Sequence, residues 1–243
     1  YKALEDWQID VDVVDGSIFK DQTADQYEVL VLAANDCYAL DPDSELEQGI
    51  AAWVKNGGML LHGPMDLLAQ ASVGSRCLSH GKDAFECSGE KGMLTGTQFG
   101  SFEEENADVL AVWETDENPA IVKRTFGKGT VCEIGFFYGF EYTGRIAPHV
   151  PLTQRNNELY PLTMLKKDPV GMLLEEKFGT TLTRKKGVER AEFENGTVIV
   201  NHSSYPCRID EPGTRYFQNP ELYQDLDSKI LLPHMGVFIE RKV

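Results

Sequence analysis

Positive charge is scarce in this chain. Its 243 residues include 23 Lys and Arg against 39 Asp and Glu, which gives a formal net charge of −16. Nucleic-acid phosphates and anionic membrane surfaces bind proteins through clusters of Lys and Arg. We therefore expect no nucleic-acid partner and no membrane partner, and we interpret the acidic excess as a source of solubility.

Long apolar runs are also missing. No stretch approaches the roughly 20 apolar residues that span a bilayer, and the chain opens on the amphipathic segment Tyr1–Trp7 rather than on an apolar signal-peptide core. We expect a cytoplasmic protein, so the sequons at Asn195 and Asn201 are interpreted as coincidental. The first residue is not Met, and we interpret the sequence as an excised fragment of a longer chain in preference to a processed mature chain.

Paired cysteines are absent as well. The five cysteines are odd in number and widely spaced, without a Cys-x-x-Cys pair, which argues against a disulfide framework. Cys37 and Cys132 lie beside apolar runs and are expected to be core thiols. The segment Cys77–Cys87 contains two Cys and one His but lacks a clear fourth ligand, so we expect no metal site and no cofactor.

The first half of the chain alternates strand and helix signals. Ile9–Val14 alternates at period two and predicts a strand, while the continuous apolar run Val29–Ala34 is typical of a parallel strand covered on both faces. A helix is predicted from Asp41 to Asn56, followed by a strand over Met59–Leu61. This order predicts an α/β fold with right-handed crossovers and a doubly wound sheet.

The middle of the chain combines a long excursion with a hairpin. Residues 72–102 are rich in Gly, Ser and charge and predict a loop with short local elements. A strand is predicted over Val109–Trp113, and two more, Ala120–Arg124 and Thr130–Ile134, flank a Gly-rich turn and predict a hairpin. An aromatic insert at about residues 136–167 precedes a predicted helix, Pro169–Phe178, with Gly179 as its C-cap.

After Gly179 the pattern changes to short strand candidates separated by Gly, Pro and Asn turns. They cover Val188–Phe193, Val198–Val200, Cys207–Ile209 and Val237–Ile239. We therefore predict two domains. An α/β domain spans residues 1–179 and contains the insert, and a small antiparallel β domain spans residues 180–243.

The strand predicted over Met59–Leu61 is not followed by a nucleophile. The carboxyl end of such a strand is where a nucleophile elbow places Cys or Ser. Here Gly63, Pro64 and Met65 form the turn, and none of the three can be activated. The flanking His62 and Asp66 are interpreted as a structural pair.

Three groups of residues, in this order and spacing, resemble one known arrangement. They are Tyr27–Leu32 with Trp53–Leu60, then Asn118–Val131, and finally Asn195–Ser203 with the closing Leu232–Phe238. Together they resemble the segment that follows the catalytic barrel of family 42 β-galactosidases. In that segment a trimerisation domain similar to class I glutamine amidotransferases precedes a small β domain. The resemblance covers nearly the whole chain.

The resemblance implies a flavodoxin-like domain that assembles a homo-oligomer, such as a trimer, and helps to wall a neighbouring subunit's active site. The catalytic carboxylates of such enzymes lie in the barrel, so no catalytic residue is expected here, and carbohydrate would be a partner only through the parent enzyme. Amidotransferase relatives use a Cys-His-Glu set. The Gly63–Met65 turn lacks the Cys, and Glu133–Tyr138 lacks a His-x-Glu pattern, so these roles are unfilled.

The insert contains the main candidates for a functional surface. Aromatic rings stack on sugars or pack at subunit interfaces, and Arg and His bond hydroxyl groups. The candidates for substrate contact or for an interface are Tyr138, Tyr142, Arg145, His149, Arg155 and Tyr160. Packing or an interface is the simpler interpretation.

Two other functions stay open. A stand-alone hydrolase of the amidotransferase superfamily would use His149, Glu141 or Glu158 of the insert. A carbohydrate-binding module would act through aromatic residues of the β domain, namely Tyr205, Tyr216, Phe217 and Tyr223. The acidic run Glu103–Glu105 predicts a solvated face rather than a catalytic pair, which needs carboxyls facing each other.

Overall fold

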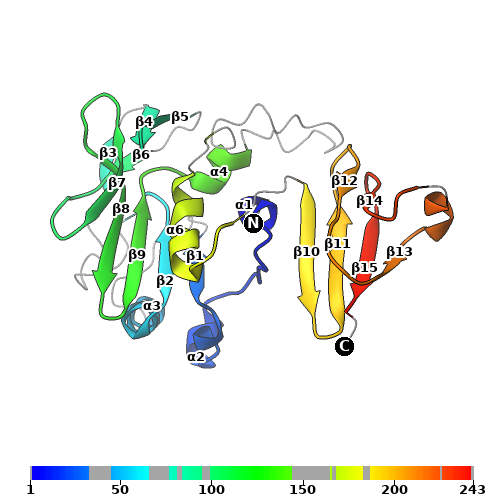
Figure 1. Ribbon diagram of the computed structural model, residues 1–243. Coiled ribbons are helices and arrows are strands. Elements are labelled where there is room, and N and C mark those ends of the chain that lie inside the picture. The colour runs from blue at the N-terminus through cyan, green and yellow to red at the C-terminus, as the bar shows by residue number, and fades with distance from the viewer. Residues whose placement is uncertain are drawn as a thin grey trace. The chain divides into compact units, whose positions relative to one another are not determined.

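A computed structural model describes residues 2–32, 45–65, 77–80, 84–94, 99–143, 165, 168–182, 187–224 and 226–241. These residues form two compact units (Figure 1). The α/β unit contains the described residues from Val13 to Thr143 together with the helix that ends at Phe178, and the β unit contains those up to Asp12 and from Gly179 onward. None of the described helices has the length and apolar character needed to cross a bilayer.

The α/β unit is built on a mixed seven-stranded sheet in the order β1-β2-β9-β8-β7-β4-β5 (Figure 1). The strands are β1 (Val29–Leu32), β2 (Met59–His62), β4 (Ala84–Cys87), β5 (Glu90–Met93), β7 (Asp108–Trp113), β8 (Pro119–Phe126) and β9 (Gly129–Ile134). The pairs β1/β2 and β2/β9 are parallel, and every later pair is antiparallel. A separate small sheet pairs β3 (Leu78–His80) with β6 (Phe99–Ser101). The predicted α/β class is confirmed.

The described helical segments of the α/β unit are α2 (Ser17–Lys20), the 3-10 turn η1 (Ala24–Gln26), α3 (Glu45–Asn56), α4 (Tyr138–Thr143) and α6 (Pro169–Phe178). Helix α3 confirms the predicted helix from residue 45 onward, while residues 41–44 lie outside the described part. Helix α6 confirms the other prediction and ends at Gly179, whose φ of +63° is the left-handed conformation of a C-cap glycine.

Helix α3 connects β1 to β2 and packs on the sheet through Ile50, Trp53 and Val54, all buried. The indole of Trp53 also donates a hydrogen bond to the carbonyl of Ala24 at 3.0 Å. The turn after the helix has to be glycine. Gly57 has a φ of +130°, and a Cβ on Gly58 would lie 2.4 Å from the Trp53 ring. This close approach explains the Gly-Gly pair read from the sequence.

The aromatic core of the α/β unit lies on the antiparallel side of its sheet. Trp113 at the end of β7 is fully buried, and its ring lies 5.6 Å from that of Phe99 and 6.3 Å from that of Phe136. Phe136 stacks in turn on Phe85 of β4 at 5.0 Å. The predicted β8–β9 hairpin is confirmed, with Phe126 paired to Gly129 across its turn.

Two strand predictions need correction. Ile9–Val14 forms no strand, because it pairs with none of the described strands, and Val13 is 89% exposed. The run Val29–Ala34 gives a strand only over β1, with residues 33–34 outside the described part. Since β1 is the outermost described strand of the sheet, Val31 is 48% exposed rather than covered on both faces.

The β unit contains a four-stranded antiparallel sheet in the order β10-β11-β15-β13, and a two-stranded sheet pairs β12 with β14. The strands are β10 (Val188–Phe193), β11 (Gly196–Asn201), β12 (Cys207–Arg208), β13 (Thr214–Phe217), β14 (Ile230–Leu231) and β15 (Gly236–Glu240), and the 3-10 turn η3 covers Pro220–Tyr223. The four predicted strands are confirmed, whereas β13 and β14 were not predicted. Helix α1 (Lys2–Asp6) joins this unit through a hydrogen bond of 3.0 Å from the Gly187 N–H to Asp6 Oδ1.

Asn201, at the end of β11, is fully buried, and its side chain forms several hydrogen bonds there. Its Nδ2 donates to the carbonyls of Tyr205 at 2.8 Å and of Leu231 and Leu232 at 3.2 Å. Its Oδ1 accepts hydrogen bonds from the backbone and hydroxyl of Ser203. The side chain therefore ties β11 to the segment that follows β14.

Candidate functional site

The turn predicted to lack a nucleophile follows β2, where parallel strands β2 and β9 lie side by side. Register pairs His62 at the end of β2 with Glu133 of β9. The carboxyl ends of parallel strands are where α/β folds place their ligands. Gly63, Pro64 and Met65 come next and are half-buried, and Met65 packs against the core beneath α3. Asp66 lies outside the described residues.

Glu133 is fully buried and is neutralised by Arg124 of β8. The Arg124 Nε lies 2.7 Å from Glu133 Oε2, and the side chains are 9% and 0% exposed. The other two guanidinium nitrogens of Arg124 donate to the backbone carbonyls of Glu103 and Glu105. The side chains of Glu103, Glu104 and Glu105 are exposed. The backbone carbonyls of the acidic run therefore bond to a buried ion pair, whereas its carboxylates are exposed to solvent.

The Cys132 side chain, on β9 beside β2, is in the wrong protonation state for a nucleophile. Burial raises the pKa of the Cys132 thiol to about 12, so the thiolate is not formed at neutral pH. Burial also lowers the pKa of His62, and the charge of Glu133 opposes this shift only in part. The His62 Nδ1 contacts the Gly63 carbonyl at 2.9 Å, which assigns the ring proton to Nδ1. Its Nε2 has no partner among the described residues.

The lowered pKa of His62 predicts a loss of stability in mild acid. Unfolded histidine titrates near pH 6.5, and the folded group titrates lower, so the unfolded chain binds more protons between the two values. Stability is complete above about pH 6.5 and falls as the pH decreases towards the folded pKa, by up to about 1.4 kcal/mol per pH unit. Urea unfolding between about pH 7.5 and about pH 5.5 measures this slope.

The control for this prediction is a second histidine. His62→Gln is expected to flatten the slope, whereas His234→Gln, at an exposed position of the β unit, is expected to leave it intact. An equal slope in the native protein and in the His62→Gln variant would contradict the assignment.

The insert is described at its start, where Tyr138 and Tyr142 lie on α4, and at Leu165. Tyr142 is 2% exposed, and its ring centroid lies 5.8 Å from that of Tyr138. The Tyr138 hydroxyl donates to Asp168 Oδ2 at 2.8 Å, and Asp168 Oδ1 accepts from the N–H groups of Val170 and Gly171 in the first turn of α6. The two tyrosines therefore connect α4 to the start of α6 and extend the aromatic core.

The other candidates of the insert cannot be placed. Arg145, His149, Arg155 and Tyr160 lie outside the described residues, as does Glu158. Glu141 is described and is 1% exposed. Their roles in an interface, in sugar contact or in catalysis stay predictions.

The aromatic residues named for the β unit divide into two pairs. Phe217 and Tyr223 stack on each other with ring centroids 3.9 Å apart, and both belong to its hydrophobic core. Tyr205 is 77% exposed, and Tyr216 is 53% exposed. A sugar-stacking surface on the described part of this unit would therefore use Tyr205 and Tyr216.

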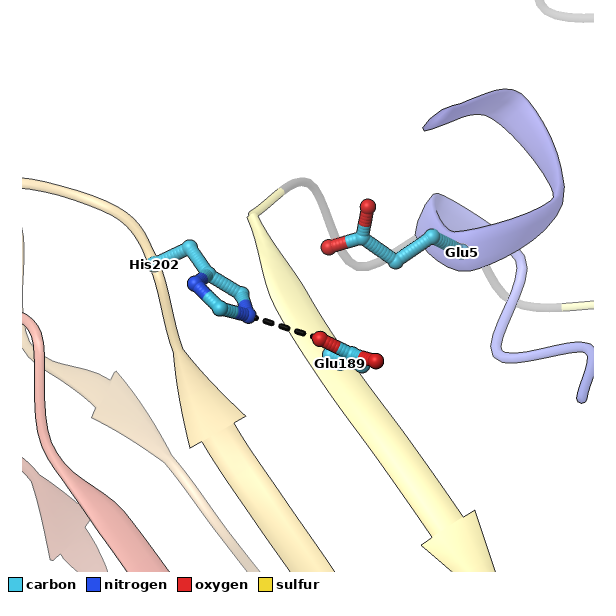
Figure 2. A group of neighbouring side chains, drawn as sticks. All are labelled: Glu5, Glu189 and His202. Carbon is cyan, nitrogen blue, oxygen red and sulfur yellow. Dashed lines mark hydrogen bonds and ion pairs between the residues drawn. The ribbon is translucent and has the colours of Figure 1, made fainter. Parts of the chain in front are cut away.

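Sequence reasoning missed one cluster of charged side chains in the β unit. Glu5 of α1, Glu189 of β10 and His202 after β11 point towards a common centre (Figure 2). The His202 Nε2 lies 2.8 Å from Glu189 Oε2. Register in the β10–β11 hairpin could have placed Glu189 diagonally opposite His202 on one face, but no local pattern relates either residue to Glu5.

Comparisons with known proteins give a structural match alone. No protein-family model matches the chain, and no curated protein matches it. Solved structures do match. A β-galactosidase from the Antarctic haloarchaeon Halorubrum lacusprofundi aligns over 99% of the chain with a TM-score of 0.68 and 18% identity. A GH42 β-galactosidase from G. stearothermophilus aligns over 100% with a TM-score of 0.64 and 16% identity.

A third such structure, the β-galactosidase of the psychrophilic Marinomonas ef1, aligns over 100% of the chain with a TM-score of 0.62 and 20% identity. The aligned region makes up 35%, 35% and 33% of these three chains in the order given. The chain therefore has the fold of about one third of a β-galactosidase chain, and both of its units belong to the match.

Proposed function

We propose that this chain is a non-catalytic region of a β-galactosidase-like glycoside hydrolase whose catalytic barrel lies elsewhere in the parent protein. The observation that carries the proposal is the alignment of the whole chain with one third of several β-galactosidase chains. A fold by itself does not fix a function. The state of the described side chains is therefore the second line of support.

That second line is the absence of a usable nucleophile among the described residues at the strand ends of the α/β unit. Gly63, Pro64 and Met65 form the turn after β2, the Cys132 thiol is held protonated, and Glu133 is engaged by Arg124. We propose that the unit is a flavodoxin-like, amidotransferase-like domain without amidotransferase chemistry. Its three parallel strands and the α3 connection support this proposal.

The proposed role of the α/β unit is to assemble a homo-oligomer, such as a trimer, and to shape the sugar site of the parent enzyme. The predicted domain division at residue 179 is part of this proposal, with residues 1–12 packing on the second domain. The insert from Tyr138 to Tyr160 is the proposed contact surface. Tyr142 is buried, so its replacement would disturb the core, and Arg145 is the better position for a test.

The test uses the purified chain and two measurements. Its molar mass by sedimentation equilibrium is expected to exceed that of the 27.2 kDa monomer, and it is expected not to hydrolyse a chromogenic galactoside. Arg145→Ala is expected to weaken association, while Arg208→Ala, an exposed position of β12, serves as the matched control. Galactoside hydrolysis by the chain alone would refute the non-catalytic role. A monomeric native chain would refute the assembly role.

A carbohydrate-binding role is the second candidate, favoured by the exposed rings of Tyr205 and Tyr216. Stacking of a sugar on these rings would be weakened by Tyr216→Ala and measured by calorimetry with galactose. The absence of any heat of binding would exclude this role. Hydrolysis abolished by replacing Glu141, His149 or Glu158 would instead favour the stand-alone hydrolase.

A further inference from the structure

The positions of two residues of the cluster, Glu189 and His202, follow from the register of the β10–β11 hairpin. Val188 of β10 pairs with Asn201 of β11, and the His202 N–H continues the ladder by donating to the Gly187 carbonyl at 2.7 Å. Glu189 lies two residues beyond Gly187, so its side chain points to the same face as that of His202. The 2.8 Å contact between His202 Nε2 and Glu189 Oε2 follows from this diagonal arrangement.

The third residue of the cluster, Glu5, lies on helix α1 in the amino-terminal segment. Helix α1 is fixed against β10 by the bond from Gly187 to Asp6, and Gln8 Nε2 also donates to the Val188 carbonyl. This placement turns Glu5 towards the other two side chains and leaves it only 9% exposed (Figure 2). One ligand atom from each of Glu5, Glu189 and His202 lies within 4.8 Å of the other two.

The surroundings of the cluster are acidic. A cavity of about 270 Å³ borders it and is lined by Glu5 and Glu189 together with Asp10, Asp12 and Glu192. Arg190 is the one basic residue of that lining within the described chain, and it forms ion pairs with Glu192 and Glu211. Arg241 also pairs with Glu192, so the repulsion falls on the other carboxylates of this group, and a bound cation would relieve it.

We propose that Glu5, Glu189 and His202 form a binding site for one divalent transition-metal cation, which fastens the amino-terminal helix to the β10–β11 hairpin. This inference goes beyond the proposed function and does not depend on it. An imidazole with two carboxylates suits Mn²⁺ or Zn²⁺, whereas Ca²⁺ and Mg²⁺ take oxygen ligands. Three protein ligands leave coordination positions for water on the side of the cavity.

The geometry requires only a small adjustment. Ligand atoms around one ion at roughly 2.1 Å lie about 3 to 3.4 Å apart. The His202 and Glu189 atoms are already this close, and their side chains are 49% and 40% exposed, which leaves them room to turn. Glu5 is the least mobile of the three, so it would set the position of the ion.

The test measures Mn²⁺ binding to the chelator-treated chain by electron paramagnetic resonance, in which bound Mn²⁺ loses the signal of the free ion. We expect one Mn²⁺ per chain, and Zn²⁺ is expected to displace it. His202→Asn and Glu189→Gln are each expected to weaken binding by roughly tenfold or more. The matched controls His234→Asn and Glu221→Gln, both at exposed positions of the same unit, are expected to bind as the native chain does.

Two results would overturn the proposal. One is the absence of Mn²⁺ binding up to about 1 mM, which is weaker than a three-ligand site should be. The other is unchanged affinity in His202→Asn. If a variant fails to fold, paramagnetic broadening of the native chain's amide signals gives the answer. Broadening is expected around Glu5, Glu189 and His202, and broadening centred elsewhere would refute the site.

Discussion

Replacing Arg124 by Met is expected to lower the free energy of unfolding of the α/β unit by about 3 to 5 kcal/mol. The variant leaves the Glu133 carboxylate fully buried without its guanidinium, and the backbone carbonyls of Glu103 and Glu105 lose their donors. A buried charge without a partner is far more costly than the loss of an exposed pair. Urea unfolding followed by circular dichroism measures the difference.

The neighbouring residue provides the control. Lys123 forms its ion pair with Glu176, whose side chain is 63% exposed, so Lys123→Met is expected to cost no more than about 1 kcal/mol. The double variant Arg124→Met/Glu133→Leu removes both charges and is expected to recover much of the lost stability. Equal effects of Arg124→Met and Lys123→Met would show that the buried pair has no special role.

Trp113→Ala is expected to lower the free energy of unfolding by a similar amount, about 3 to 5 kcal/mol. The ring is fully buried between Phe99 and Phe136, and its Nε1 donates to the Gly100 carbonyl at 3.0 Å. Its removal opens a cavity and leaves that carbonyl without its donor. Thermal and urea unfolding would both report the loss.

Val109 lies on the same strand and serves as the comparison. Its side chain is 38% exposed, so Val109→Ala is expected to change stability by less than about 1 kcal/mol. Trp113→Phe should fall between the two variants, because it keeps most of the apolar volume and loses the hydrogen bond. A Trp113→Ala variant as stable as Val109→Ala would mean that the surrounding rings close the cavity.

The elements that sequence predicts well are those with a strong local cause. The β8–β9 hairpin has its Gly-rich turn, and α6 has Gly179 at its end, so both follow from residues a few positions apart. Ile9–Val14 has an equally regular pattern but pairs with none of the described strands, and no local signal reports that the pairing is missing. Strand β13, Thr214–Phe217, was missed because four residues of mixed polarity carry too short a pattern.

The candidate sites likewise divide into those that a local pattern predicts and those that depend on tertiary packing. The lack of a nucleophile in the turn Gly63–Met65 could be predicted directly from the sequence, because residue identity alone rules out a nucleophile. The Arg124–Glu133 pair follows from hairpin register and could have been inferred once the strands were aligned. The approach of Glu5 to Glu189 and His202 could not, since it depends on where α1 packs, and that is decided by tertiary contacts over more than half of the chain.

The buried amide of Asn201 has a consequence for how this protein can be produced. Asn201-His202-Ser203 and Asn195-Gly196-Thr197 are both acceptor sequences for N-linked glycans. Asn195 lies exposed in the turn between β10 and β11 and can carry a glycan. The Nδ2 of Asn201 is enclosed by three carbonyls, so a glycan attached during secretion from a eukaryotic host would prevent the β unit from closing. Expression in a bacterial host, which does not attach such glycans, avoids this obstacle.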